Sequence, residues 1–172
     1  MRQPLVFTII AKDRPGIVRR VAEVLREHSG HWNQSSMSRL SGRFAGMLQA
    51  DVPEAHLESC TAAMESLAEE GLHVVIRRGE PTQETASGPE YRLELVGNDR
   101  PGIVSDISTV LAAHKVNVHG LETLVEGASM AGGELFRAWA SLQLPQGMDA
   151  QELTAHLEEL ANDLMVDIVL ER

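Results

Sequence analysis

Cysteine and aromatic residues are scarce in this chain of 172 residues. Cys60 is the only cysteine, so the chain can form no internal disulfide and has no Cys-x-x-Cys pair for zinc or redox chemistry. Aromatic residues make up 3% of the sequence, too few for an RNA-recognition motif, which stacks bases on aromatic side chains of a basic sheet. A lone cysteine fits a reducing compartment, and we expect a cytoplasmic protein.

Long hydrophobic runs are missing as well. The N-terminal run LVFTII is far too short to cross a bilayer and leads into Lys12, Asp13 and Arg14. No signal peptide is visible. We therefore expect no membrane partner.

Positive charge is scarce in the second half of the chain. The formal net charge is −10: residues 1–80 carry 10 Lys and Arg against 10 Asp and Glu, whereas residues 81–172 carry 5 against 15. A phosphate backbone is bound by a basic face, so direct nucleic-acid binding is not expected. The acidic half is either a solvated surface that aids solubility or a face for a basic patch on another protein.

Catalytic motifs are absent too. The sequence has no Ser-His-Asp or Gly-x-Ser-x-Gly pattern, and no His-x-x-x-His pair with a carboxylate partner. His28 and His114 fall late in two predicted helices, where the helix dipole favours a structural role. His31 and His119 are not at equivalent positions of the repeat described next, and Cys60 falls on an apolar helix face, which predicts a buried thiol. We expect no catalytic residue, no metal and no cofactor; a small enzyme built on the histidines is the weakest hypothesis.

The hexamer DRPGIV occurs twice, at residues 13–18 and 99–104, so the two copies are 86 residues apart. Each copy follows a short apolar run and precedes an amphipathic run, which is the pattern of a strand, a tight turn and a helix start. The proline presets the backbone for a first helical turn, and the aspartate before it can cap free N–H groups. The chain is therefore predicted to contain one unit duplicated.

Each half reads in the order β-α-β-β-α-β. In the first half, residues 5–11 form a strand, and the helix that follows carries one apolar stripe and stops near Ser29-Gly30; the stripe is Ile17, Val18, Val21, Val24 and Leu25. Ser41-Gly42 is a turn signal between two strands, the second being residues 43–52. A helix at residues 54–70 and a strand at 72–76 complete the first half.

The second half repeats this order. The predicted strands are 91–96, 116–125, 135–144 and 165–170, and the predicted helices are 103–114 and 150–163. The fold class is α+β: two ferredoxin-like βαββαβ domains, each a four-stranded antiparallel sheet with two helices on one face. We expect a first domain at 1–79, a linker at 80–89 and a second domain at 90–172, with a longer hairpin loop at 127–133. The bare sheet faces or edges are candidate surfaces for a homodimer.

The two turns are the candidate ligand sites. Proline and glycine let a ligand approach the helix start, where free N–H groups and the helix dipole suit a carboxylate. Asp13 or Asp99 could cap the helix or receive an ammonium group, so the pair of groups fits a small zwitterion. Asn33 and Asn117, taken as equivalent positions entering the second strand, are expected to lie beside the turns and to donate and accept hydrogen bonds. A purely structural role for all of these residues remains open.

The strand, the D-R-P-G-[ILV] turn, the amphipathic helix and the following Asn resemble the ACT domain, a module that senses small molecules, commonly amino acids. The resemblance covers essentially the whole chain. It implies ligand contacts where the turn and first helix of one unit meet a strand edge of another; the residues so implied are Asp13, Gly16, Ile17, Asn33, Asp99, Gly102, Ile103 and Asn117.

A free-standing pair of such units, with SMAGGELF at residues 129–136, is most similar to the family of glycine cleavage system transcriptional repressors. That resemblance implies glycine as ligand and a DNA-binding transcriptional activator as protein partner. A stand-alone regulatory subunit of an amino-acid metabolic enzyme is the alternative.

Overall fold

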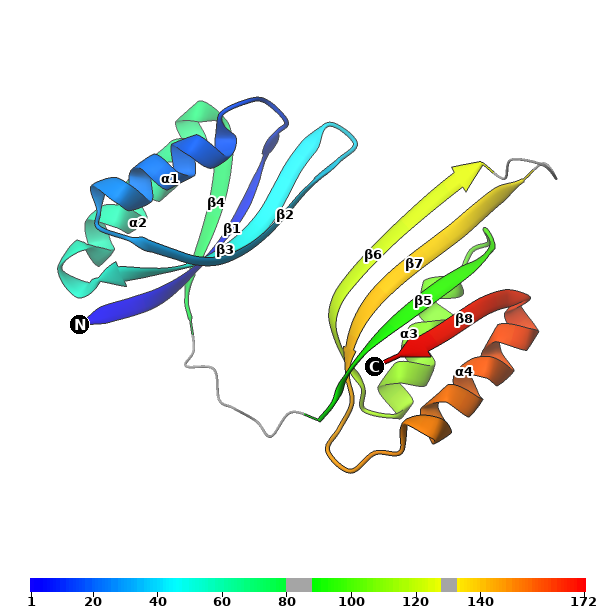
Figure 1. Ribbon diagram of the computed structural model, residues 1–172. Coiled ribbons are helices and arrows are strands. Elements are labelled where there is room, and N and C mark those ends of the chain that lie inside the picture. Colours follow the sequence, from blue (N-terminus) through cyan, green and yellow to red (C-terminus); the bar gives the residue numbers. More distant parts are fainter. Residues whose placement is uncertain (80–87, 128–132) are drawn as a thin grey trace. The chain divides into compact units, whose positions relative to one another are not determined.

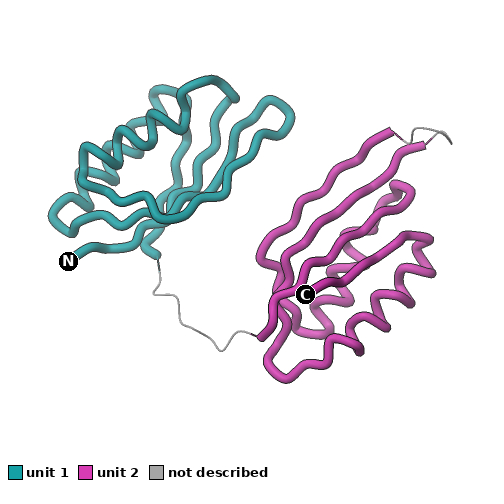
Figure 2. Tube along the Cα trace, in the orientation of Figure 1, with its two compact units in different colours: residues 1–83 teal, residues 84–172 magenta. Residues whose placement is uncertain are grey.

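The computed structural model describes residues 1–79, 88–127 and 133–172, and the chain divides into two compact units, Met1–Gln83 and Glu84–Arg172 (Figure 2). The first unit contains β1 (Arg2–Lys12), α1 (Ile17–Glu27), β2 (His31–Leu40), β3 (Arg43–Pro53), η1 (Glu54–His56), α2 (Leu57–Ser66), η2 (Leu67–Glu70) and β4 (Leu72–Arg78). The second contains β5 (Glu90–Asn98), α3 (Ile103–Ala113), β6 (Asn117–Gly127), β7 (Glu134–Gln143), α4 (Ala150–Leu164) and β8 (Val166–Glu171).

Each unit is a four-stranded antiparallel sheet with its two helices on one face (Figure 1). The strand orders are β2-β3-β1-β4 and β6-β7-β5-β8, so the first strand of each unit is central and the second is an edge. The predicted fold class is confirmed. Most of the predicted linker (80–89) and of the predicted loop (127–133) lies outside the described residues, and the domain boundaries stay a prediction.

The two cores are built from the helix-facing sides of the strands. In β1, burial alternates, because residues two apart in a strand share a face. The buried set of the first unit is Leu5, Phe7, Ile9, Ala11, Ile17, Val21, Val24, Leu25, Leu48, Ala50, Val52, Cys60, Met64, Leu67 and Leu72. The second unit has a separate set with the same layout, centred on Leu93 and Leu95 of β5.

One predicted core position is wrong. The predicted apolar stripe of α1 includes Val18, but Val18 is 47% exposed, whereas Ile17 and Val21 are buried. Val104, its counterpart in α3, is 41% exposed. A stripe of period 3.6 accommodates the residues at i, i+4 and i+7, and the residue at i+1 turns outward. The valines therefore flank the core at both helix starts.

The Ser41-Gly42 turn forms as predicted. Both residues adopt positive φ, 48° for Ser41 and 73° for Gly42, and Leu40 pairs with Arg43. Two residues with positive φ make the turn whose twist matches that of the flanking strands. The tip of this hairpin lies at the same end of the sheet as the first DRPG turn, because the Asp13 N–H donates to the Gly42 carbonyl at 3.0 Å.

Helix lengths are modest throughout. In the part of the chain that the structure describes, no helix combines the length and the hydropathy that a membrane crossing requires.

Candidate functional site

Each DRPG turn ends in a glycine that starts the helix. Gly16 and Gly102 are the N-cap residues, with φ of 93° and 99°, and the helices begin at Ile17 and Ile103. Pro15 therefore precedes the N-cap, and the prediction that it opens the first helical turn is wrong. The left-handed glycine turns the chain into the helix, a conformation that other residues rarely adopt.

Neither helix start is capped by a side chain, so the capping role predicted for Asp13 and Asp99 is not observed. The first bonds within the helices run from the Arg20 N–H to the Gly16 carbonyl and from the Asp106 N–H to the Gly102 carbonyl, each at 2.9 Å. The backbone N–H groups that precede these in each helix have no carbonyl within the helix to bond. Together with the helix dipole they form a locally positive end that suits a carboxylate.

The aspartates anchor the turns to the neighbouring hairpins through their backbones. Besides the Asp13–Gly42 bond, the Asp99 N–H donates to the Glu134 carbonyl at 2.8 Å. The Asp13 carboxylate pairs with Arg39 at 3.4 Å, and the Arg39 side chain is 72% exposed. Exposed ion pairs contribute little, so a ligand ammonium group can compete with Arg39 for this carboxylate.

The arginine of the first turn reaches the other side of the unit. Arg14 Nη2 donates to the Glu70 carbonyl at 2.9 Å, and Arg20 Nε donates to the Glu70 carboxylate at 2.9 Å. This hydrogen bond to Glu70 raises the pKa of Arg20, which therefore stays charged. The first turn is thus held between the β2–β3 hairpin and the end of η2.

The second turn differs in charge. Arg100 Nη2 pairs with the Asp106 carboxylate at 3.3 Å, within its own turn and helix start. Asp106 lies in the first turn of α3, whereas the first turn of α1 has no acidic residue. A carboxylate already occupies the positive end of α3 and would repel a second one. The first unit therefore offers the more open helix start.

The predicted contribution of the asparagines to these turns is wrong within each unit. Strand pairing through β3 places Trp32 of β2 level with the beginning of β1. It places Arg39 level with the end of β1, where the DRPG turn follows. Asn33 lies six residues before Arg39, which corresponds to about 20 Å along a strand. Since β2 begins where α1 ends, it begins at the end of the unit opposite the turn. Asn117, the first residue of β6, is placed likewise.

The two asparagines are not equivalent either. The register shifts between Trp32 and Gln34 in β2 and between Val118 and Gly120 in β6, so the extra residue is Asn33 in one strand and His119 in the other. Asn117 corresponds to His31, because both are the first residues of strands that follow the helix ends in the same way. Matching by residue type paired Asn33 with the wrong position.

Replacing either turn glycine with alanine is expected to lower the free energy of unfolding of its unit by about 1 kcal/mol, because an L residue at positive φ is strained even where there is space. At Gly16 an added Cβ meets nothing within 4 Å, so crowding makes no contribution. Gly120→Ala is the matched control: its backbone is in the ordinary range and the added Cβ makes only 3.9 Å contacts with Ser141. Urea unfolding of Gly16→Ala, Gly102→Ala and Gly120→Ala tests this. Equal stability in all three would contradict the expectation.

An apolar cavity of about 190 Å³ lies under α3 in the second unit. Its walls are Leu93, Val104, Ile107, Ser108, Leu111, Val118, Leu121, Phe136, Ala138 and Ala140. Leu93 and Ala140 pair across β5 and β7, where the first unit pairs the larger Phe7 and Leu48 across β1 and β3. Smaller side chains at equivalent positions explain the space. Val104 at the start of α3 lines this cavity, but Asp99 and Gly102 of the turn itself do not.

The histidines at the helix ends each contact a backbone carbonyl of their own helix. His28 Nδ1 lies 2.8 Å from the Val24 carbonyl, and His114 Nδ1 lies 2.9 Å from the Val110 carbonyl. A carbonyl only accepts, so in both rings Nδ1 carries the proton. Each imidazole thereby satisfies a carbonyl in the last turn of its helix.

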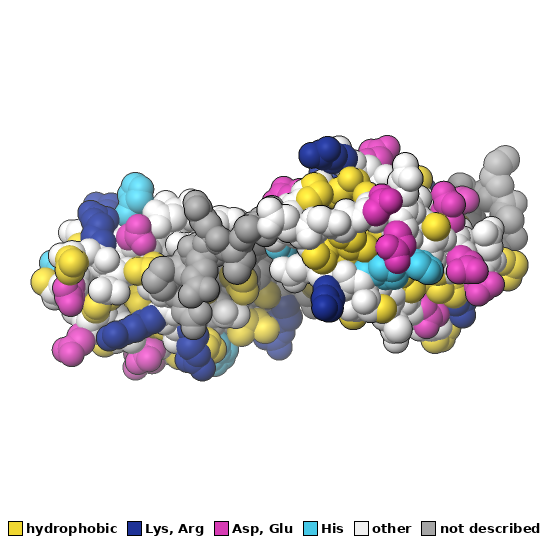
Figure 3. Space-filling view, turned by 90° about the horizontal axis from the view of Figure 1, so that it is seen from below, with side chains coloured by type: hydrophobic (Ala, Val, Ile, Leu, Met, Phe, Trp, Pro, Cys, Tyr) yellow, Lys and Arg dark blue, Asp and Glu magenta, His cyan; other side chains and the backbone are white. Residues whose placement is uncertain are grey.

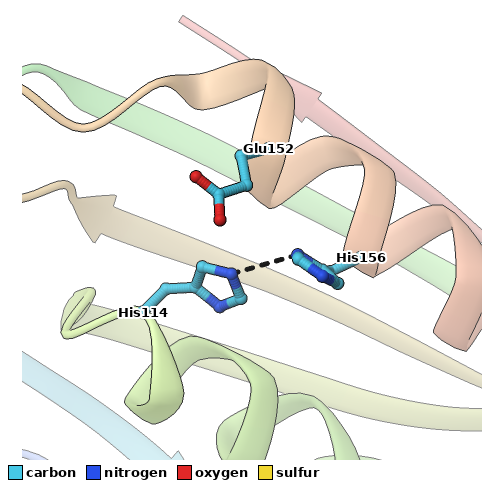
Figure 4. A group of neighbouring side chains, drawn as sticks. All are labelled: His114, Glu152 and His156. Carbon is cyan, nitrogen blue, oxygen red and sulfur yellow. Dashed lines mark hydrogen bonds between the residues drawn. The ribbon is translucent and has the colours of Figure 1, made fainter.

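One group of side chains could hold a metal ion and was missed by the sequence reasoning. Among the described residues, His114, Glu152 and His156 bring their ligand atoms within 4.8 Å of one another (Figure 4). The sequence signal was Glu152-x-x-x-His156, because residues four apart share a helix face. His114 lies at the end of α3, remote from the turn that begins the same helix.

Both halves of the chain match the same domain family. Residues 3–76 and residues 91–138 match models of the ACT domain. No curated protein matches the sequence. Among solved structures, an "unknown protein" from Galdieria sulphuraria is 30% identical, with a TM-score of 0.87 over 99% of this chain and 98% of that one. A "putative glycine cleavage system transcriptional repressor" is 17% identical, with a TM-score of 0.71 over 99% and 97% of the two chains. At 17% identity, the second likeness shows the fold alone.

Proposed function

The chain belongs to the ACT domain family, and on that premise we propose that it is a non-catalytic regulatory protein that responds to an amino acid bound at its DRPG turns. The observation that carries the proposal is the pair of uncapped helix starts, each preceded by a left-handed glycine and an aspartate. The helix start attracts the ligand carboxylate, and the aspartate attracts its ammonium group. The same geometry twice in one chain supports a role beyond chain reversal.

The first DRPG turn is the proposed primary site. The helix that follows it, α1, has no acidic residue in its first helical turn, and among the described residues the Asp13 carboxylate is engaged only by the exposed Arg39. After the second DRPG turn, Asp106 lies in the first helical turn of α3 and competes with a ligand carboxylate. We therefore expect the two units to differ in affinity.

Glycine is the first ligand to test, because 99% of this chain aligns in fold with the protein described as a "putative glycine cleavage system transcriptional repressor". The partner in this proposal is a DNA-binding transcriptional regulator. The acidic second unit, with 5 Lys and Arg against 15 Asp and Glu in residues 81–172, supports contact with a basic protein surface. On the face shown in Figure 3, Asp and Glu side chains are numerous over this unit and Lys and Arg are few.

Ligand binding is tested by calorimetry and melting temperature with glycine and a panel of other amino acids. At a ligand concentration 100 times Kd, the melting temperature is expected to rise by on the order of 10 °C. Asp13→Ala should weaken binding by about 10-fold or more, because it removes a charged hydrogen-bond partner. Glu58→Ala, which removes an exposed carboxylate in the first turn of α2, is the matched control and should bind as the unaltered chain does.

The second unit is tested in parallel with Asp99→Ala and Asp106→Asn. A weak second site should tighten in Asp106→Asn, because the repulsion of the ligand carboxylate is removed. Binding of no amino acid at millimolar concentration, or equal binding by the Asp13→Ala and Glu58→Ala variants, would refute recognition at the first turn.

The partner is tested by affinity purification from the cells that make the protein. Recovery of a DNA-binding regulator, released by the amino acid found above, is the expected result. Recovery of an amino-acid metabolic enzyme instead would favour the alternative, a stand-alone regulatory subunit.

A further inference from the structure

We propose that the second unit carries a binding site for a divalent transition-metal ion, zinc in the first instance, formed by His114, Glu152 and His156. The site lies between the C-terminal end of α3 and the first half of α4, and it does not depend on the proposed function of the turns. Figure 4 shows the three side chains pointing toward one another from the two helices.

The two imidazoles already face each other. His114 Nε2 lies 3.1 Å from His156 Nδ1. Two nitrogens bound to one tetrahedral zinc ion are about 3.3 Å apart, given Zn–N bonds of about 2.0–2.1 Å. The two nitrogens are therefore already close to the separation that a shared ion requires. Without an ion, His156 Nδ1–H donates a hydrogen bond to His114 Nε2.

The protonation of His114 is set by the helix. Its Nδ1–H donates to the Val110 carbonyl at 2.9 Å, which leaves the lone pair on Nε2, the atom that faces His156. A metal-bound histidine commonly donates its other N–H to a carbonyl in this way, and this contact fixes the ring and its tautomer. The half-buried His114 is therefore prepared as a ligand before the ion arrives.

Glu152 supplies an anionic third ligand. It lies four residues before His156 on α4, so both side chains leave the same helix face. Its carboxylate is within 4.8 Å of the imidazole nitrogens, and its side chain is exposed and can close the remaining distance. Two imidazoles and one carboxylate suit zinc and neighbouring divalent transition metals, whereas Mg²⁺ and Ca²⁺ prefer oxygen ligands. The acidic composition of this half adds general attraction for a cation.

The first unit provides an internal control. The buried pair Cys60 and Met64 of α2 corresponds to the buried pair Leu153 and Leu157 of α4, four residues apart in each helix. The residues one position earlier are Ser59 and Ala63 in the first unit and Glu152 and His156 in the second. His28 makes the same carbonyl contact as His114 and lies near one further histidine, His56, with the ring centroids 6.5 Å apart, but among the described residues no group of three potential metal ligands forms around it. The fold therefore does not require the cluster.

The test uses the full chain without a polyhistidine tag, stripped of metal with a chelator that is then removed. Zinc is titrated by calorimetry and by competition with a chromophoric chelator. We expect one site that loses at least about 10-fold in affinity in His114→Ala and in His156→Ala, because loss of even an outer partner of a metal ligand commonly costs that much, with a smaller loss in Glu152→Gln. His28→Ala, the matched control in the first unit, should bind as the unaltered chain does.

Cobalt absorption adds a readout of the ligands. The visible spectrum of the Co²⁺-loaded chain should change in His156→Ala and remain in His28→Ala. Circular dichroism of each metal-free variant checks that the fold is intact. Zinc affinity that is equal in the unaltered chain, His114→Ala and His156→Ala would overturn the proposal, as would the absence of zinc binding at millimolar concentration. Amino-acid binding at the turns can succeed or fail independently of either result.

Discussion

Replacing Phe7 with alanine is expected to lower the free energy of unfolding of the first unit by about 3–5 kcal/mol. Phe7 has no exposed surface, and in β1 it pairs with Leu48 of β3 on one side and Ile76 of β4 on the other. Loss of the ring leaves a cavity in the centre of the sheet that paired backbones cannot close.

The measurement is urea or thermal unfolding that resolves a transition for each unit. The two sets of buried core side chains share no member, so we expect the second unit to unfold as before. Leu93→Ala is the matched variant in the second unit, and we expect it to cost less, about 2–3 kcal/mol, because Leu93 already borders a cavity. An equal shift of both transitions in either variant would show that the units do not unfold independently.

Cys60 is expected to react with a thiol reagent at least about 1,000-fold more slowly in the folded chain than in the unfolded chain, given ordinary domain stability. Cys60 has no exposed surface, and burial raises the pKa of its thiol, so the folded state both blocks access to the sulfur and disfavours the reactive thiolate. Labelling must then proceed through opening of the first unit, and its rate follows the stability of that unit.

The same raised pKa predicts a dependence of stability on pH. The folded state keeps the thiol proton at a pH where the unfolded state has lost it, so the folded state binds more protons. The contribution is complete below the ordinary thiol pKa and is lost as pH rises from there toward the raised value. Cys60→Ala should remove this alkaline decline.

The two variants can be combined in one labelling experiment. Phe7→Ala should accelerate labelling of Cys60 by about 100-fold or more, since each 1.4 kcal/mol is a factor of ten. Leu93→Ala should leave the labelling rate unchanged, because Cys60 belongs to the other core. Rapid labelling of the unaltered folded chain would contradict the buried position of the thiol.

The repeat and its periodicity determined most of the fold. The order of strands and helices, the Ser41-Gly42 turn and the buried position of Cys60 in α2 follow from local patterns that depend only on neighbouring residues. These patterns were sufficient to predict two four-stranded sheets, because a strand face and a helix stripe have few ways to cover each other.

Local patterns predicted the structure of the DRPG turns less well. They located both turns but assigned the N-cap to Asp13 and Asp99, whereas Gly16 and Gly102 take that position. Several chemically reasonable roles exist for Asp, Pro and Gly at a helix start, and the choice among them depends on how the turn is bonded to a distant hairpin. The constant spacing of 86 residues would have matched Asn33 with His119, since no insertion interrupts the strand, turn and helix before them.

The sequence by itself determined that the chain is a duplicated strand-and-helix unit with two equivalent helix starts, because repetition and periodicity are properties of the order of residues. Only the tertiary structure decided that Asn33 lies at the far end of its sheet from the turn. It alone also brought His114 to His156, 42 residues later in the chain. Strand register and the packing of α3 beside α4 determine which residues meet in space, and the number of residues between them along the chain does not.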